Sequence, residues 1–389
     1  MVTLYDVARE AGVSTATVSR VVHGQDRVSD STRLRVMHVI EQLGYVPDGA
    51  AQSLSRRRKE IIGFVCVESH GRQYDVEAMN LLYYDEVMRG VGAAVSDRGW
   101  SLLITYVDGE PERDFPRLRA LSGKVDGIII GQSVVPAPVL AQIADRVPVV
   151  VIGGAPAERA VDVVTADNRS GSAALVTHLI EVHGRRRLFC VDGPADVSDA
   201  RERRTGVERV LRAHPGTSLV GSYQGKFSVQ SGVSAGESLL ERHGDALPDA
   251  VVAANDQMAI GAIQALNRAG VRTPQDVAVV GFDDIYPGGL NDPPLTTVHQ
   301  PMRLLGERAC IRLLDRIARP ELHPRAEVLP TELVVRSSCG CSPDSAVRQP
   351  VKRTRRSRQP DGSATGPPQT AARRRSPGPA DVRIPEIVS

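Results

Sequence analysis

Polar and charged side chains follow several buried apolar runs in this chain of 389 residues. Asp283 ends the run VAVVGFD and Asn255 ends VVAAN, while Arg203 follows the run FCVDG on the next predicted helix. Phe227 in QGKFSV adds an apolar surface. In open parallel sheets, ligands bind beyond the carboxyl ends of the strands. Carboxylate, guanidinium, amide and aromatic groups there suit a hydroxyl-rich ligand, which needs paired donors and acceptors and a ring face to cover.

Simpler roles compete for some of these side chains. Asn255 could equally N-cap the helix that follows it. Arg201, two residues before Arg203, is better interpreted as a solvated or structural charge. For Asp283 the cleft role is favoured, because a carboxylate that ends a buried strand needs a partner.

The segment STATVSR, residues 14–20, carries side chains that could contact DNA. Ser14, Thr17 and Ser19 can hydrogen-bond phosphates or bases, and Arg20 can reach the O6 and N7 atoms of a guanine. Bulky side chains at positions 15 and 16 would hold the backbone away from the base edges, and the chain has Thr15 and Ala16 there.

Local signals predict three helices around this segment. Thr3 with Asp6 forms a capping box, Gly12 suits the left-handed position after the first helix, and Ser14 caps the second. Ser29 is the cap candidate of a third helix, which Gly44 ends. A glycine-containing turn between two short helices indicates a helix-turn-helix, whose second helix enters the major groove. A small helical domain that binds protein is the alternative.

From Ile61 onward, continuous apolar runs alternate with amphipathic stretches, as in βαβ units with strands buried on both faces. The runs are IIGFVCV, WSLLITYV, GIIIG, VPVVVIGG, RLFCVDG, DAVVAAND and DVAVVGFDD. The predicted fold class is therefore α/β: a three-helix helix-turn-helix domain (1–46), a hinge helix and linker (47–60), a two-lobed doubly wound parallel-sheet domain (61–342), and a disordered basic Pro/Arg-rich tail (343–389).

Charge is segregated along the chain. Residues 1–59 carry nine Lys/Arg and six Asp/Glu, and residues 343–389 carry ten and four, so the middle is acidic. We call residues 1–59 the head and residues 60–342 the body. A basic head on an acidic body suggests that the head binds a polyanion. We expect a cytoplasmic protein, because the N-terminus lacks a secretory signal, no apolar run is long enough to cross a bilayer, and the five cysteines are few and scattered.

Two motifs are interpreted as incidental. The pattern GVSAG around Ser234 matches that of hydrolases, but helix is predicted on both sides, whereas that chemistry requires a strand before the serine. Cys339 and Cys341 are interpreted as incidental thiols, because the sequence shows no second ligand pair nearby. No catalytic residue, metal ligand or cofactor is therefore predicted.

Several segments resemble those of one family. VTLYDVAREAGVSTATVSRVVHG is very similar to the N-terminal signature of the lactose-repressor (LacI/GalR) family of bacterial regulators. The similarity continues through VTADNRSGSAALVTHLIE, VAANDQMAIGAIQALNRAGV, VAVVGFDDI and PPLTTVHQPMRLLGERA, to about Ser338. The resemblance implies a body similar to periplasmic binding proteins.

By this resemblance, Thr15 and Ala16 choose the operator sequence, and segment 48–55 is a hinge helix whose Leu54 wedges into the minor groove. Asp48, Gly49 and His23 depart from the usual family residues, which suggests a looser hinge. The predicted DNA-binding residues are Tyr5, Ser14, Thr15, Ala16, Thr17, Ser19, Arg20 and Leu54.

The resemblance also assigns effector binding to Arg203, Asp283, Phe227 and Asn255. It implies a DNA-binding transcriptional regulator, favoured as a repressor, that binds a pseudo-palindromic operator and is controlled by a small effector, a sugar rather than a purine. A homodimer at the nucleoid is expected, since the tail has no leucine heptads for a tetramer. The alternatives are an extracytoplasmic solute-binding protein and a hydrolase that uses Ser234.

Overall fold

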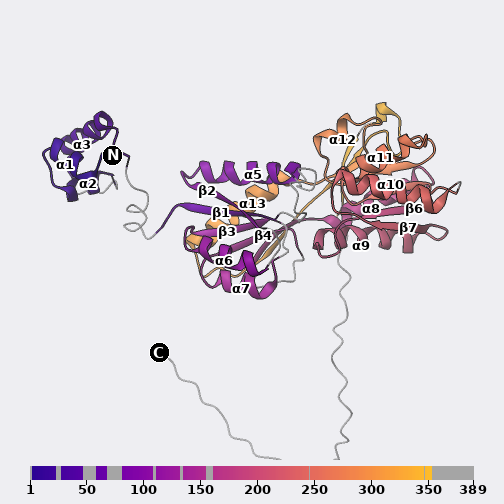
Figure 1. The fold of residues 1–389 in the computed structure, drawn as a ribbon, viewed down its shortest axis with the longest axis horizontal. Helices are drawn as coiled ribbons and strands as arrows, with labels where there is room; N and C mark the ends of the chain where they lie inside the picture. The colour runs from indigo at the N-terminus through magenta and orange to yellow at the C-terminus, as the bar shows by residue number, and fades with distance from the viewer. Residues whose placement is uncertain are drawn as a thin grey trace, which may run out of the picture. The chain divides into compact units, whose positions relative to one another are not determined.

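The computed structural model describes residues 2–22, 28–46, 58–67, 81–107, 111–131, 135–154, 161–244, 246–345 and 347–352 (Figure 1). The predicted hinge helix with Leu54, the departure at His23, and residues 353–389 of the predicted tail lie outside the described residues. Within the described part, no helix is both long and apolar enough to cross a membrane.

The head has three helices: α1 (Leu4–Glu10), α2 (Thr15–Val22) and α3 (Asp30–Leu43). Its predicted caps are confirmed. Thr3 and Asp6 form the capping box, and the Ser14 hydroxyl accepts a hydrogen bond from the Thr17 amide at 3.2 Å. Ser29 caps α3 in the same way. These local bonds satisfy amides that a short helix would otherwise leave unpaired.

One apolar cluster holds the three helices of the head together. Its buried members come from all three: Val7, Ala8, Ala11, Val18, Val21, Val36 and Val39. Two backbone positions need glycine, since Gly12 and Gly44 adopt φ of 65° and 61°. The helix-turn-helix geometry therefore follows from the order of caps, glycines and valines in the sequence.

The first lobe contains a six-stranded sheet in the order β11-β5-β4-β3-β1-β2, in which every neighbouring pair is parallel. Figure 1 shows α5 above this sheet and α6 and α7 below it. One core lies between the sheet and α5 with α13, and a second lies under α6 and α7. The elements are β1 (Ile61–Val67), α5 (Leu81–Ser96), β2 (Ser101–Val107), α6 (Pro111–Ser122), β3 (Gly127–Gly131), α7 (Ala137–Ala144), β4 (Val149–Ile152), β5 (Asp162–Ala166), α13 (Met302–Ala318) and β11 (Ala326–Leu329).

The second lobe has a four-stranded parallel sheet in the order β7-β6-β8-β9 and a small antiparallel sheet in the order β10-β12-β13. Its cores lie under α8 with α9 and under α10 with α11. The elements are α8 (Asn168–Glu181), β6 (Arg187–Asp192), α9 (Ser198–Ala213), β7 (Ser218–Gln224), α10 (Val229–His243), β8 (Ala250–Ala253), α11 (Asp256–Arg268), β9 (Ala278–Val280), α12 (Tyr286–Leu290), β10 (Thr297–His299), β12 (Glu332–Val335) and β13 (Val347–Pro350). The predicted two-lobed, doubly wound α/β body is confirmed.

The chain passes between the lobes at three places: after β5, after β10 and after β11. Each lobe is therefore built from sequence segments that are far apart. Residues at these crossings, such as Gln300, can contact both lobes.

The predicted boundary of the disordered tail at residue 343 is wrong for its first residues. β13 (Val347–Pro350) pairs with β12, and Arg348 forms an ion pair with Asp284 at 2.5 Å. Backbone pairing and this ion pair order a segment whose composition alone suggested disorder.

Close helix packing explains glycines in two helices, one of them in the discounted GVSAG motif. Ser234 lies inside α10, and a Cβ at the neighbouring Gly232 would overlap the backbone of Met258 in α11. Likewise, a Cβ at Gly90 in α5 would overlap the backbone of Arg303 in α13. Helical residues of α10 come directly before Ser234, so the strand-to-helix nucleophile turn that a hydrolase needs is not formed there.

The Gly90→Ala substitution should lower the free energy of unfolding by about 1–3 kcal/mol, because the added methyl group forces α5 and α13 apart. Gly92, in the same helix, is the matched control, since a Cβ there would meet no neighbouring atom within 4 Å. Gly92→Ala should be neutral or stabilising by up to about 1 kcal/mol through helix propensity. Urea unfolding of both variants checks this, and equal effects would contradict the packing argument.

Candidate functional site

The Arg203 guanidinium is the centre of a polar cluster at the carboxyl ends of the second-lobe strands. It lies on α9 and is buried. Its Nε donates to Oδ1 of Asn168 at 2.8 Å, and its Nη2 donates to Oε1 of Gln300 at 2.7 Å. Its Nη1 donates to the Ala254 carbonyl at 2.6 Å. A planar fork held at several points is a rigid donor surface.

Asp283 pairs with this arginine. Its Oδ1 lies 3.2 Å from Nη1 of Arg203, and both side chains are buried. Oδ1 nevertheless has no well-aligned hydrogen bond within the described residues. Burial raises the pKa of Asp283 to about 6, against the opposing pull of Arg203. Asp283 also adopts φ of 116°, a strained conformation for a residue with a Cβ.

Aromatic rings cover the arginine. The guanidinium carbon lies 3.8 Å from the centroid of Phe282 and 6.0 Å from that of Phe227. Asn255 caps α11 by accepting from the Met258 amide, and its Nδ2 donates to the Phe227 carbonyl at 3.1 Å. The capping role that the sequence left open for Asn255 is thus present, and it also positions Phe227, while effector contact by Asn255 and Phe227 stays a prediction.

Four cluster residues were missed by the sequence analysis: Asn168, Gln300, Asp199 and Tyr83. Asn168 and Gln300 hydrogen-bond Arg203 directly, as given above. Asp199 lies four residues before Arg203 on α9, so its helical spacing could have found it. Burial, with smaller contributions from Asp199 and Asp283, raises the pKa of Tyr83 well above its usual value. Tyr83 Oη and Gln300 Nε2 are buried without a hydrogen-bond partner among the described residues.

Asp199 connects the two lobes. Its Oδ1 accepts from the amide of Gly154, which follows β4 in the first lobe, at 3.2 Å. Burial raises the pKa of Asp199, with Arg203 opposing the shift. Polar atoms from both lobes thus lie around one guanidinium, and some of them lack a partner within the described part of the chain. This arrangement suits a small polar ligand whose binding affects how the lobes meet.

Arg201, the neighbouring arginine, behaves as the sequence suggested. Its side chain is exposed and donates to the Ala195 carbonyl at 2.9 Å. It takes no part in the Arg203 cluster in the described structure, so its role is structural.

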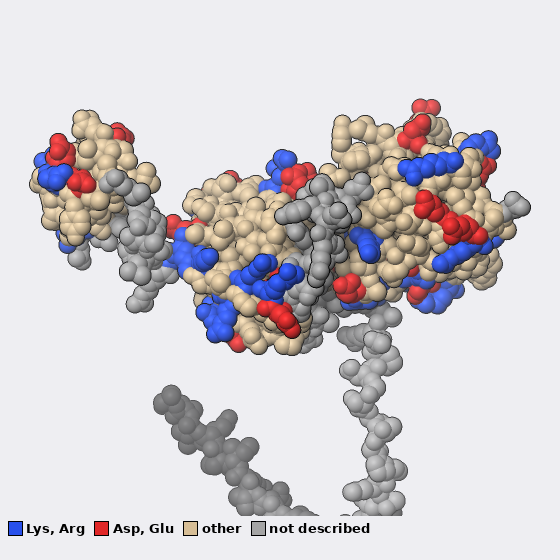
Figure 2. Space-filling model, viewed as in Figure 1, with Lys and Arg blue, Asp and Glu red and all other residues tan. Residues whose placement is uncertain are grey.

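The predicted DNA-binding residues in and just before α2 are less buried than Val18 and Val21 of the same helix. Ser14, Ala16 and Arg20 are exposed, and Thr15, Thr17 and Ser19 are half-buried. Tyr5 on α1 is 76% exposed. The helix-turn-helix interpretation requires such accessible side chains here, and DNA contact by them stays a prediction, while Leu54 lies outside the described residues. On the visible face of the body, basic and acidic side chains are interspersed (Figure 2).

The premise for dismissing the two cysteines is wrong. The fold brings His178 and His183 beside Cys339 and Cys341, so that four potential ligand atoms lie within 4.8 Å of one another. The sequence could not show this, because His178 and Cys339 are 161 positions apart.

Comparison with known proteins places both parts of the chain. Residues 3–48 match the family described as bacterial regulatory proteins, lacI family, and residues 176–339 match a periplasmic binding protein-like domain. The ribose operon repressor of Escherichia coli (strain K12) is 34% identical over 343 residues, covering 87% of this chain and all of that protein.

Two solved structures agree with this. A complex of the transcriptional regulator CelR with cellobiose is 36% identical, with a TM-score of 0.64, and covers 87% of this chain and 100% of its own. A lac repressor dimer bound to operator and the anti-inducer ONPF is 28% identical, with a TM-score of 0.77, covering 87% and 99%. These similarities extend over the head and both lobes, so the chain belongs to the lacI family of bacterial regulatory proteins, which are transcriptional regulators and not enzymes.

Proposed function

We propose that this chain is a repressor that binds a pseudo-palindromic operator as a homodimer, and that a sugar bound around Arg203 and Asp283 controls its affinity for DNA. The single observation that carries the proposal is the polar cluster between the lobes, in which buried atoms of Asp283, Gln300 and Tyr83 have no hydrogen-bond partner among the described residues. Unsatisfied buried polar atoms cost free energy, and a hydroxyl-rich ligand would supply their partners. The match of residues 3–48 to the lacI family argues against the solute-binding protein, and the position of Ser234 within a helix argues against the hydrolase.

An exposed apolar surface supports the dimer. Leu82, Tyr286, Leu290 and Leu304 come from both lobes and line one cavity of about 730 Å³. Tyr286 and Leu290 are 79% and 68% exposed, which is unusual for large apolar side chains on a monomer. The related lac repressor is a dimer on its operator. A second copy covering this surface would place two heads at two half-sites.

The remaining parts of the proposal concern the linker and the effector. Residues 47–60 act as the hinge, and Leu54 enters the minor groove of a bound operator at the nucleoid in the cytoplasm. A sugar is favoured as effector because CelR, a related regulator, was solved with cellobiose. Closure of the lobes around the sugar would alter the spacing of the two hinges, and so couple the cleft to DNA affinity.

Operator selection from random duplexes tests the proposal. The full chain should enrich a two-fold symmetric site, and log Kd for that site should rise linearly with log salt concentration. A thermal-shift screen of sugars, sugar phosphates and purines should then identify a sugar that shifts this Kd. Binding without preference for any sequence would disprove the regulatory role, and a response to purines alone would disprove the sugar.

Effector affinity should fall in acid. The pKa of Asp283 is raised to about 6 by burial, so its carboxylate, the acceptor for effector hydroxyls, is lost below that pH. Affinity for the sugar found in the screen should then decrease by up to about tenfold per pH unit. Calorimetric titration from about pH 8 to about pH 5 measures this slope. The Asp283→Asn variant should bind the sugar weakly, and its affinity should not depend on pH in this range. If the variant showed the same slope as the parent chain, the titration would belong to another group.

Stability should change in the opposite sense. The folded pKa of Asp283 lies above its unfolded value of 3.8, so its contribution to stability is complete below that value and is lost as the pH rises through about 6. The parent chain should therefore gain stability relative to Asp283→Asn when both are taken from neutral pH to about pH 5.

A further inference from the structure

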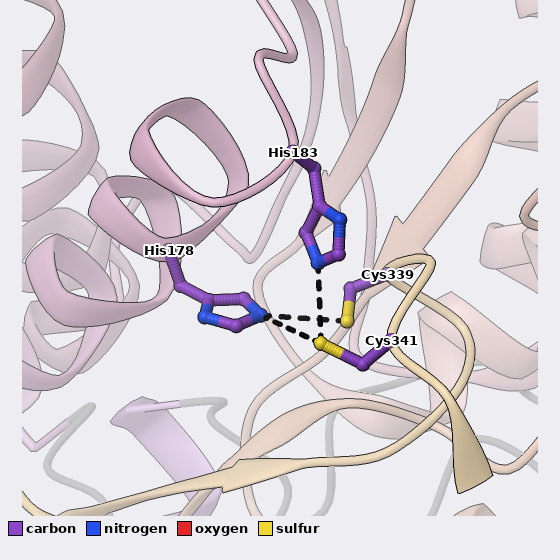
Figure 3. Close-up of side chains that lie close together, drawn as sticks. All are labelled: His178, His183, Cys339 and Cys341. Atoms are coloured by element: carbon purple, nitrogen blue, oxygen red, sulfur yellow. Dashed lines mark hydrogen bonds between the residues drawn. The ribbon is translucent and has the colours of Figure 1, made fainter. Parts of the chain in front are cut away.

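Two histidines and two cysteines converge in the second lobe, away from the effector cluster. His178 lies in the last turn of α8 and His183 lies just after that helix. Cys339 and Cys341 lie on the segment that follows β12 (Figure 3). Figure 3 shows the imidazole rings and the sulfur atoms pointing toward one common centre.

Three of the six distances between the donor atoms match the edges of a metal-coordination tetrahedron. Nε2 of His178 lies 3.5 Å from Sγ of Cys339 and 3.6 Å from Sγ of Cys341. Nε2 of His183 lies 3.3 Å from Sγ of Cys341. Zinc–sulfur bonds of about 2.3 Å and zinc–nitrogen bonds of about 2.0 Å in a tetrahedron separate the ligands by about 3.3–3.8 Å. All four donor atoms lie within 4.8 Å of one another, so side-chain movement alone would let them share one ion.

The backbone holds both pairs in place. Gly184, with φ of 65°, follows His183 directly, and its amide donates to the Ile180 carbonyl at 3.0 Å. Gly340 separates the cysteines with φ of 114°, and a Cβ there would lie 3.3 Å from Nδ1 of His183. A glycine at this position lets the thiol-bearing turn pack directly on the imidazole.

The burial of the cluster favours a structural site over an exposed reactive one. Cys339 is fully buried in the core under α8, and Cys341 and both histidines are partly buried. Sulfur–imidazole hydrogen bonds are weak, so these contacts alone are a poor reason to gather two thiols and two imidazoles. Two sulfur and two nitrogen donors in a closed tetrahedral set are the ligands that zinc prefers in structural sites.

We propose that His178, His183, Cys339 and Cys341 bind one zinc ion that fastens the segment after β12 to the end of α8. The same segment leads to β13, whose Arg348 pairs with Asp284 beside the effector cluster. Metal binding therefore stabilises the second lobe and the exit of its last ordered strand. The proposal does not depend on operator or sugar binding.

Metal titration of the full chain tests the site. The protein is purified under reductant, stripped with a chelator and titrated with Zn²⁺ and with Co²⁺. We expect one ion per chain, a Co²⁺ spectrum with tetrahedral ligand-field and thiolate charge-transfer bands, and a higher Tm in the presence of Zn²⁺.

Substitutions assign the ligands. Cys341→Ser and His183→Gln should each weaken Zn²⁺ binding by about 100-fold or more and remove the Tm increase, and Cys341→Ser should also weaken the thiolate band. Cys310→Ala is the control, because Cys310 is a buried thiol in the first-lobe core. This variant should still bind one Zn²⁺ per chain, even if the substitution changes the Tm of the metal-free protein.

Two results would overturn the proposal. One is a stripped chain that is folded by circular dichroism but binds neither ion. The other is a folded Cys341→Ser variant that binds Zn²⁺ as tightly as the parent, which would place the ion elsewhere. Cys341 is only partly buried, so its serine variant should fold well enough to be decisive.

Discussion

The Arg203→Met variant should lose about 3–5 kcal/mol of unfolding free energy, together with its response to the effector. Methionine keeps much of the volume but removes every donor, so Asp283, Asn168 and Gln300 would stay buried without their partner. Removing one member of a buried ion pair typically costs this much, because the remaining charge is uncompensated. Chemical denaturation measures the loss, and operator binding with and without the sugar measures the response.

Arg201→Met is the matched control for this variant. Arg201 lies on the same helix, and its exposed side chain makes one hydrogen bond to the Ala195 carbonyl. The same substitution there should cost less than about 1 kcal/mol and leave the effector response intact. If the two variants were destabilised equally, the loss would reflect helix α9 as a whole and not the buried cluster.

The sequence was most informative where structure is set by nearest neighbours. The caps Thr3, Ser14 and Ser29 act on amides three residues away, so the head could be predicted helix by helix. The buried strands β1, β3 and β4 were also identifiable, because both of their faces are apolar. Both signals depend only on residues that are close together in the chain.

Elements that depend on distant partners were less predictable. β13 was interpreted as part of a disordered tail, because its polar residues carry no strand signal apart from their pairing with β12. Asp283 and Arg203 were found as candidates, but Asn168 and Gln300 were not, since they meet Arg203 only where the chain crosses between lobes. The histidine–cysteine cluster was not predicted for the same reason, because its histidines and its cysteines lie on distant segments that only the fold brings together.

Removal of the Arg20 side chain should weaken operator binding far more than removal of another exposed arginine in the same head. Arg20 lies on the exposed face of α2, where a guanidinium can bond one guanine in each half-site. Each lost contact costs about 1–3 kcal/mol, so a dimer of Arg20→Ala should lose about 2–6 kcal/mol, or roughly 30-fold to 10⁴-fold in Kd.

Arg9→Ala is the control, because Arg9 on α1 is exposed and already paired with Asp6. Its loss should change Kd by less than about threefold and leave sequence preference unchanged. Anisotropy titrations on the selected operator and on a scrambled duplex separate the two effects. Equal losses on both duplexes for both variants would mean that Arg20 acts only as a positive charge and that α2 does not read bases through it.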